Sequence, residues 1–403
     1  MVWIHGGGFG FGSAADKYYD GTALAGKEGV VVVSINHRLN GFGYLNLGPG
    51  AHGDFDQNVG QLDIVQALQW VRQNIARFGG DPNNVTLFGQ SGGAGKISVL
   101  LAMPSAKGLF HKAIVESGSD VHTNDVAASL AERDKVLAAF NLKPDEILTL
   151  RDMPMQALID GFTRAGILNY HPVMDGNVLP TQPYDPVANP ISATIPLLLG
   201  TAHDEATSVL ATNPVWPAMT DAQLPAMVGA LLTGPADAAE GIALYKAHAP
   251  ADKPMHIFSS MMTDQMFTVN AMQMAERKST QPAPVYMYRV DWHSPMRSGI
   301  LRSPHGVDLP FVFDTVAETE ELVGHGPSQD RMTHLMRSSF AAFARAGNPN
   351  IKGSGYPLWP KYDIKRRAVF VFNDPPSVTH DPDPDLRAFW EKVAAHKKAA
   401  VKN

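Results

Sequence analysis

Short apolar runs alternate with longer amphipathic stretches along much of this chain. The runs are rich in Val, Ile, Leu or Phe, have the length of buried strands, and are separated by helical patterns in the first half. This alternation predicts an α/β fold with a mostly parallel central sheet flanked by helices. The predicted strands are Met1–His5, Gly29–Ile35, Val85–Phe88, Ala113–Glu116, Pro196–Gly200, Val285–Val290 and Val369–Phe372.

Apolar residues recur every three or four positions from Leu62 to Phe78, which predicts an amphipathic helix. The segment Gly79-Gly80-Asp81-Pro82 follows and stops it. A shorter helical segment is predicted near Thr22–Gly26, and another from Ala94 to Met103. The basic, Ala-rich tail Lys392–Asn403 predicts a final surface helix.

Two regions interrupt the alternation, approximately Val121–Tyr170 and Ala206–Lys278. Both have mainly helical patterns and contain many methionines, which pack flexibly in cores and can also form an adaptable wall over a pocket. We therefore expect a single domain spanning residues 1–403, with cap-like helical insertions at about 121–170 and 206–278.

Composition narrows the classes of function. The chain has 403 residues, of which 44% are hydrophobic, so it can bury a substantial core. The net charge is −6, and no basic run suggests a nucleic-acid partner. The absence of cysteine excludes disulfides, thiolate metal sites and cysteine nucleophiles. No apolar stretch is long enough for a membrane span.

The N-terminus has an unusual pattern. Val2-Trp3-Ile4 has the composition of a buried strand but is preceded by no polar segment and by no basic region typical of a signal peptide. We expect that further sequence precedes it in the natural protein, and that without it an edge strand is exposed. The sequence assigns no compartment and no oligomeric state.

Gly89-Gln90-Ser91-Gly92-Gly93 lies between a predicted strand and a predicted helix. This G-x-S-x-G pattern is meaningful in that context, because a sharp strand-to-helix turn exposes the serine hydroxyl and leaves little room for side chains at the flanking glycines. The helix amides that follow favour a developing oxyanion. Ser91 is therefore a candidate nucleophile.

A second Gly-rich segment, His5-Gly6-Gly7-Gly8-Phe9, directly follows the first predicted strand. Its glycines leave backbone amides open to a substrate oxygen. Such a segment upstream of a G-x-S-x-G turn is typical of an oxyanion loop.

A nucleophilic serine also requires a base and an acid that orients it. The predicted strand Pro196–Gly200 runs into Asp204 and Glu205, and spacing alone does not choose between these two acids. Among the histidines, His305 stands in a loop late in the chain, which gives the order serine, acid, histidine of α/β-hydrolases. The rival bases are His293, His325 and His380.

Together these segments resemble the type-B carboxylesterase family, the carboxylesterase/cholinesterase-like α/β-hydrolases, over nearly the whole chain. The segments that carry the resemblance are Trp3–Phe9, Val32–Leu39, Ala67–Pro82, Val85–Ser91, Gly200–Glu205, Pro304–Phe313, Gly347-Asn348-Pro349 and Trp359-Pro360.

The resemblance implies a serine hydrolase that cleaves carboxylic esters through an acyl-enzyme intermediate. It implies Glu205 as the triad acid with Ser91 and His305, and an oxyanion hole formed by the amides of three glycines, Gly7, Gly8 and Gly92. It also implies that Ser119 lies behind the triad and bonds to Glu205, although Ser117 is an equally polar neighbour.

The chain departs from the family pattern next to the serine. Gln90 replaces the usual Glu, which removes a negative charge and disfavours a cationic substrate, and Gly92 replaces the usual Ala. Ala206 stands where glycine usually follows the acid.

We expect a small-molecule ester as substrate, and no metal or cofactor. The alternatives are a catalytically inactive cholinesterase-like binding module and an amidase, lactonase or peptidase on the same scaffold.

Overall fold

The structure is a computed structural model that describes residues 1–48, 57–167, 170–232 and 234–402. It contains two compact units. Unit 1 comprises Met1–Asp16, Gly29–Leu197 and Thr280–Ala283, and unit 2 comprises Lys17–Glu28, Leu198–Ser279 and Pro284–Asn403. The expectation of a single domain with cap-like insertions stays a prediction.

Unit 1 is built on a parallel sheet with the strand order β2-β1-β3-β4. Strands β1, β3 and β4 are buried along their whole length, because their apolar residues are covered on both faces. Their bounds are Val2–Ile4 for β1, Val33–Ile35 for β2, Thr86–Gln90 for β3 and Lys112–Glu116 for β4. The strands predicted from the sequence are thus confirmed, although β2 is shorter than the predicted Gly29–Ile35.

The helices of unit 1 largely follow the predicted periodicity. Helix α3 runs from Val59 to Asn74 and continues as the 3-10 turn η2 through Phe78, so it begins three residues before the predicted start. Helix α4 (Gly92–Leu100) begins directly after Ser91, and all nine of its residues are buried. The other helical segments are α2 (Asn40–Tyr44), η3 (Pro104–Ala106), α5 (Val126–Ala139), η4 (Pro144–Asp152), α6 (Met155–Arg164) and η5 (Pro190–Ser192).

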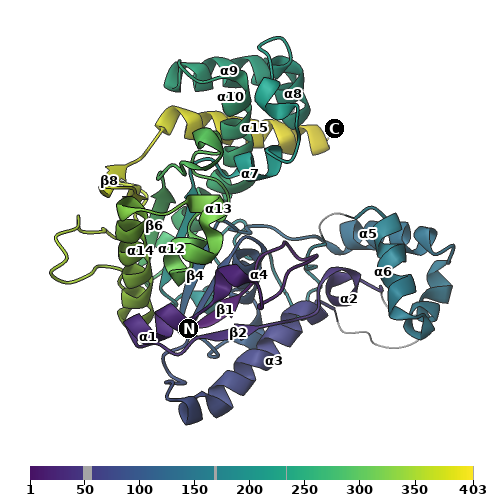
Figure 1. Ribbon diagram of the computed structural model, residues 1–403. Coiled ribbons are helices and arrows are strands. Elements are labelled where there is room, and N and C mark those ends of the chain that lie inside the picture. Colours follow the sequence, from purple (N-terminus) through teal and green to yellow (C-terminus); the bar gives the residue numbers. More distant parts are fainter. Residues whose placement is uncertain (49–56, 168–169, 233, 403) are drawn as a thin grey trace. The chain divides into compact units, whose positions relative to one another are not determined.

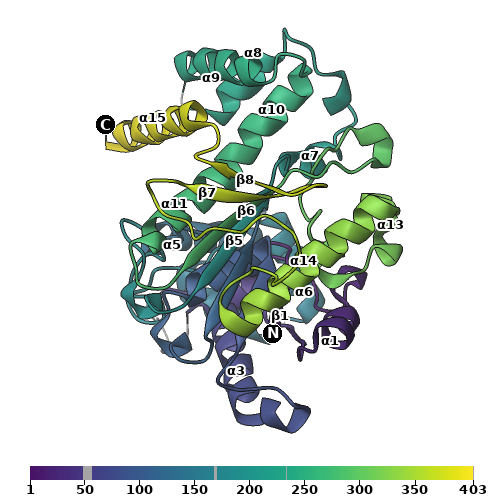
Figure 2. The ribbon, with the colours of Figure 1, turned by 90° about the vertical axis from the view of Figure 1, so that its left-hand side faces the viewer.

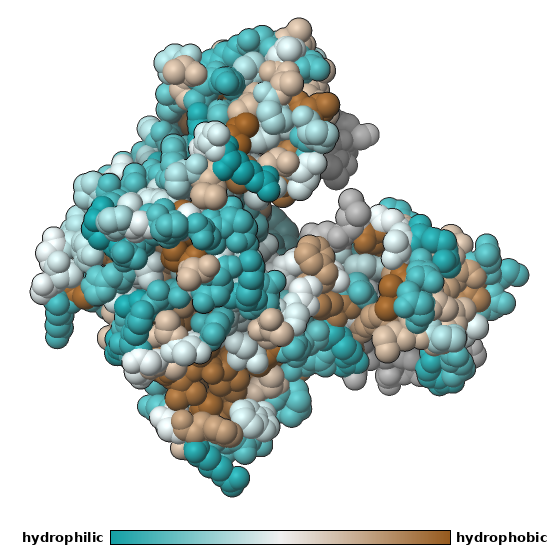
Figure 3. Space-filling view, in the orientation of Figure 1, coloured by the Kyte–Doolittle hydropathy of each residue, from teal (hydrophilic) through white to brown (hydrophobic). Residues whose placement is uncertain are grey.

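The predicted helical region 121–170 contains α5, η4 and α6, and α5 and α6 lie side by side (Figure 1). Its residues 168–169 lie outside the described residues. The surface in Figure 3 is mostly hydrophilic, with an apolar area close to the place where Figure 1 marks the N-terminus. Strand β2 is the outermost strand of the unit 1 sheet and pairs only with β1 among the described residues.

Unit 2 contains the strands β5, β6, β7 and β8, in that order. The pair β6–β7 is parallel, whereas β7–β8 is antiparallel. Their bounds are Leu197–Ala202 for β5, whose first residue belongs to unit 1, Val285–Val290 for β6, Ala368–Phe372 for β7 and Ser377–His380 for β8. Strand β8 was not predicted, because three of its four residues are polar and none is buried.

The region 206–278, in which residue 233 is not described, is helical as predicted. Helices α8, α9 and α10 pack with the C-terminal α15 around a shared apolar cluster, and Figures 1 and 2 show them grouped together. The bounds are Ala206–Leu210 for α7, Trp216–Ala218 for η6, Leu224–Leu231 for α8, Pro235–His248 for α9, Pro254–Thr263 for α10, Asp264–Thr268 for the π-helical η7, and Val269–Ser279 for α11.

The remaining helices of unit 2 include α15 (Pro384–Lys402), which begins eight residues before the predicted tail helix; the last predicted residue, Asn403, lies outside the described residues. Helix α14 packs on α12 and α1. None of the described helices combines the length and the apolar character of a membrane span. The other bounds are Lys17–Tyr19 for η1, Thr22–Glu28 for α1, Met296–Gly299 for η8, Leu309–Phe313 for α12, Ala317–Thr319 for η9, Glu320–Val323 for α13 and Pro327–Ala346 for α14.

Candidate active site

Ser91 occupies a strained turn between β3 and α4. Its backbone has φ 55° and ψ −124°, a region that non-glycine residues rarely adopt. The Ser91 amide donates to the carbonyl of Glu116 (2.7 Å), and the Ser91 carbonyl accepts from the amide of Gly95 (3.0 Å), so the strain is held from both sides. A strained turn between a strand and a helix is what the G-x-S-x-G pattern predicts for this position.

Close packing requires a glycine at Gly93, the second residue of α4. A Cβ on Gly93 would lie 1.9 Å from the carbonyl oxygen of Ile4 at the end of β1. We expect Gly93→Ala to lower the free energy of unfolding by about 3 kcal/mol, because either β1 or the start of α4 must move. The matched control is Gly229→Ala in α8, where a Cβ meets nothing within 4 Å. That variant should gain about 0.5–1 kcal/mol in urea unfolding, and a Gly93→Ala protein as stable as the wild type would contradict the packing argument.

The three glycines predicted to form the oxyanion hole are gathered beside Ser91. Gly7 and Gly8 have φ values of +93° and +57°, which side chains disfavour. Gly92 contacts Gly8 directly, because a Cβ on Gly92 would lie 2.1 Å from the Gly8 oxygen and 2.4 Å from its nitrogen. The loop after β1 therefore lies against the first residue of α4.

In unit 2, Glu205 and His305 form a hydrogen-bonded pair. The Glu205 Oε2 and His305 Nδ1 atoms are 2.5 Å apart. The other carboxylate oxygen, Oε1, accepts from the amide of Ala202 (2.7 Å), and Glu205 is fully buried. A carboxylate held in this way fixes the orientation of the imidazole.

The electrostatics of His305 follow from this pair. Burial alone would lower the pKa of His305, but the Glu205 carboxylate and its hydrogen bond, with a smaller contribution from Asp308, raise it above its ordinary value of 6.5. Burial, together with the charge of Glu205, raises the pKa of Asp308 to about 6. Asp308 accepts from the Tyr288 hydroxyl (3.2 Å) and was not singled out from the sequence.

The competing candidates have other partners. Asp204 lies 2.9 Å from His203 Nδ1 and 3.7 Å from Arg302, so of the two candidate acids only Glu205 bonds to His305. His325 is exposed and bonds to Glu320, and His380 is exposed on β8.

Gln90 and Ser119, the polar residues expected to support the nucleophile and the acid, are both buried in unit 1, as is Ser117. Gln90 ends β3 and lies beside Gly6, where a Cβ would be 3.2 Å from its Oε1 atom. The hydroxyls of Ser117 and Ser119 are buried without a hydrogen-bond partner among the described residues of their unit. The expected bond between Ser119 and Glu205, which belong to different units, stays a prediction.

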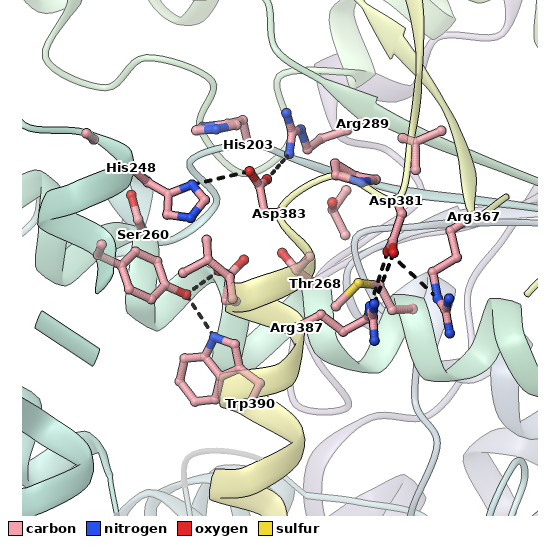
Figure 4. A pocket seen from close by; sticks show the side chains of 18 of the residues that line it. His203, His248, Ser260, Thr268, Arg289, Arg367, Asp381, Asp383, Arg387 and Trp390 are labelled. Atoms are coloured by element: carbon pink, nitrogen blue, oxygen red, sulfur yellow. Dashed lines mark hydrogen bonds and ion pairs between the residues drawn. The ribbon is translucent and has the colours of Figure 1, made fainter. Parts of the chain in front are cut away.

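A separate cavity of about 450 Å³ lies within unit 2. None of the predicted site residues lines it, although the rival base His293 does. Figure 4 shows that its charged residues face one another: Asp381 lies between Arg367 and Arg387, and Asp383 lies between His248 and Arg289. These charged residues of the cavity lining thus largely neutralise one another.

Comparisons with known proteins identify the family. The model of the carboxylesterase family matches residues 1–390. The chain is 35% identical over 399 residues to the para-nitrobenzyl esterase of Bacillus subtilis (strain 168), covering 96% of this chain and 78% of the relative. It is 33% identical to the phenmedipham hydrolase of Pseudarthrobacter oxydans, covering 93% and 75%.

Solved structures agree with this assignment. The carboxylesterase EST55 of Geobacillus stearothermophilus superposes with a TM-score of 0.86 at 35% identity, covering 96% of this chain and 81% of that chain. A para-nitrobenzyl esterase structure gives a TM-score of 0.81 at 32% identity, covering 96% and 80%. The chain therefore belongs to the carboxylesterase family, has the α/β-hydrolase fold and is a carboxylic ester hydrolase.

Proposed function

We propose that Ser91, His305 and Glu205 act together as the catalytic triad of this esterase, with the amides of Gly7, Gly8 and Gly92 as its oxyanion hole. The observation that carries the proposal is the 2.5 Å bond between His305 and the buried Glu205. With Nδ1 donating to Glu205, Nε2 is the ring nitrogen that would accept the proton of the serine hydroxyl.

The reaction begins when Ser91 Oγ attacks the ester carbonyl carbon while His305 takes the hydroxyl proton. The tetrahedral oxyanion forms against the amides of Gly7, Gly8 and Gly92. His305 then protonates the leaving alcohol, which gives an acyl-enzyme on Ser91. Water activated by the same imidazole releases the acid and restores the serine. None of these proposed steps uses a metal or a cofactor. The expectation that the enzyme needs neither stays a prediction.

The strained backbone of Ser91 supports its role as nucleophile, because strain of this kind is retained where function requires it. Gln90, which replaces the acid usual in this position, supports an uncharged ester rather than a cationic one as substrate. Uncharged aryl esters such as p-nitrophenyl acetate are therefore suitable probes.

The proposal is tested by labelling with a fluorophosphonate probe. The wild-type protein should form a stable adduct on the peptide that contains Ser91, and His305→Ala should slow the labelling by several orders of magnitude, because the hydroxyl is then not activated. Mass spectrometry identifies the labelled peptide. An adduct on another serine, or equal labelling of His305→Ala, would refute the triad.

The pH dependence of kcat/KM gives an independent check. The base must be neutral to accept a proton, so activity falls as the pH decreases through the pKa of His305. Since that pKa is raised above 6.5, the half-maximal point should lie above pH 6.5. Initial rates with p-nitrophenyl acetate measure the profile, and constant activity from about pH 5 to about pH 8 would exclude a histidine base.

A further inference from the structure

A lysine is buried within the helix that follows the nucleophile. Lys96 lies in the middle of α4 and is 0% exposed, like the apolar residues around it. Its ammonium donates to the carbonyl oxygen of Gly8 at 2.6 Å and lies 5.2 Å from the centre of the Phe9 ring. Within the described part of the chain, Lys96 forms no ion pair with a carboxylate.

Burying an ammonium group without an ion pair costs free energy of folding. Burial lowers the pKa of Lys96 to about 7, which the charge of Asp120 partly opposes. The two histidines whose pKa values the charge of Lys96 affects, His5 and His37, carry pKa values lowered chiefly by burial and offer no compensating negative charge. A methionine would fill similar space without this penalty, so packing alone does not account for the lysine.

The hydrogen bond of Lys96 acts on Gly8, one of the three glycines of the predicted oxyanion hole. Glycine torsions are weakly restrained by sterics, so the orientation of a glycine amide depends on what holds the neighbouring peptide groups. Before Gly8, the Gly7 carbonyl accepts from the amides of Phe11 (3.0 Å) and Gly10 (3.3 Å). After Gly8, its own carbonyl accepts from Lys96.

Both peptide groups that flank Gly8 are therefore anchored. In a trans peptide the N–H and C=O groups point in opposite directions, so the Gly8 amide points away from the Phe11 and Gly10 amides that hold the Gly7 carbonyl. Lys96 fixes the remaining torsion of Gly8. The anchored residue lies directly on the bare Cα of Gly92, the third predicted donor.

We propose that Lys96 is a positioning residue for ester hydrolysis: its ammonium holds the Gly8 carbonyl so that the Gly8 amide stays aimed at the oxyanion. This inference rests on the proposed function, because it requires the Gly7, Gly8 and Gly92 amides to receive that charge. Lys96 itself does not contact the substrate.

The test compares Lys96→Met with Lys96→Gln. Lys96→Met removes the donor, so kcat/KM for p-nitrophenyl acetate should fall by about 10²-fold, as expected for a misplaced catalytic group, while KM changes little. Lys96→Gln retains a donor of similar reach and should recover part of the loss. If Lys96→Met does not fold, Lys96→Gln alone tests the inference. It must then show a lower kcat than the wild type at an unchanged KM, and a wild-type kcat would contradict the inference.

The inhibition constant of a trifluoromethyl ketone distinguishes a positioning role from a merely structural one, which would leave this constant unchanged. The adduct of the ketone with the serine carries an oxyanion, so the inhibition constant should rise in parallel with the loss of kcat/KM across the variants. A wild-type inhibition constant in Lys96→Met overturns the inference. If the ketone does not inhibit the wild-type protein at all, the proposed function fails instead, so the two failures are distinguishable.

A double-mutant cycle adds a second test. Gly92→Ala pushes the Gly8 backbone away from α4, and Lys96→Met releases it from the other side. Because both changes displace the same loop, the double variant should lose less kcat/KM than the product of the two single losses. Independent, multiplicative losses would contradict the inference.

Discussion

Replacing Ser91 with alanine should reduce kcat for p-nitrophenyl acetate by about 10⁶-fold, the loss typical of removing the nucleophile of a serine hydrolase. The protein should remain folded, because Ser91 is a small residue in a turn that β3 and α4 hold in place. Alanine is strained at a φ angle of 55° just as serine is. The unfolding temperature should therefore change little. Steady-state rates and thermal unfolding measure the two effects.

The matched control is Ser260→Ala in unit 2. Ser260 lines the 450 Å³ cavity beside several histidines, so this cavity is the alternative place where a serine and a histidine could react. Ser260→Ala should retain wild-type kcat. The assignment is refuted if Ser91→Ala keeps more than about a tenth of the wild-type rate, or if Ser260→Ala loses activity instead.

Much of the fold could be predicted because most of its strands, β1, β3, β4, β5 and β7 among them, are buried along their whole length. The run Val285–Val290, which is apolar except for Arg289, becomes β6 with the predicted bounds. Strand β8 has no such signal, since Val378 is its one apolar residue and the strand pairs at the sheet edge with β7. Helix α3 begins before its first apolar repeat, because a helix end depends on backbone contacts that periodicity does not report.

The candidate site divides in the same way. The glycines and Ser91 are predictable because a tight turn leaves a pattern of adjacent residue types. Spacing does not choose between Asp204 and Glu205, because both acids follow β5 closely; the family resemblance implies Glu205, and the folded loop brings Glu205 into a hydrogen bond with His305. Lys96 was missed for a different reason: a single lysine in an apolar helix is detectable, but its partner is a carbonyl 88 residues away in sequence.

Glu205→Gln should lower kcat by about 10⁴-fold, because an amide can bond to either tautomer of the imidazole and no longer stabilises the imidazolium. The same change should shift the pH profile. The Glu205 charge raises the pKa of His305, so its removal lowers that pKa and moves the acidic limb of kcat/KM to lower pH. The residual activity should thus be less sensitive to acid than that of the wild type. Rates measured with p-nitrophenyl acetate between about pH 5 and about pH 8 provide both quantities.

Asp204→Asn is the matched control, since it makes the same chemical change at the adjacent residue. Asp204 bonds to His203 and lies near Arg302, and both partners hold its pKa below the ordinary value even though burial opposes them. Its removal should lower the unfolding temperature and leave the acidic limb where it is. Since stability from a lowered carboxylate pKa is present above the ordinary pKa and lost on acidification, the loss of stability should be clear at pH 7 and smaller in acid. If Asp204→Asn shifts the limb and Glu205→Gln does not, Asp204 is the triad acid and the Glu205 assignment is wrong.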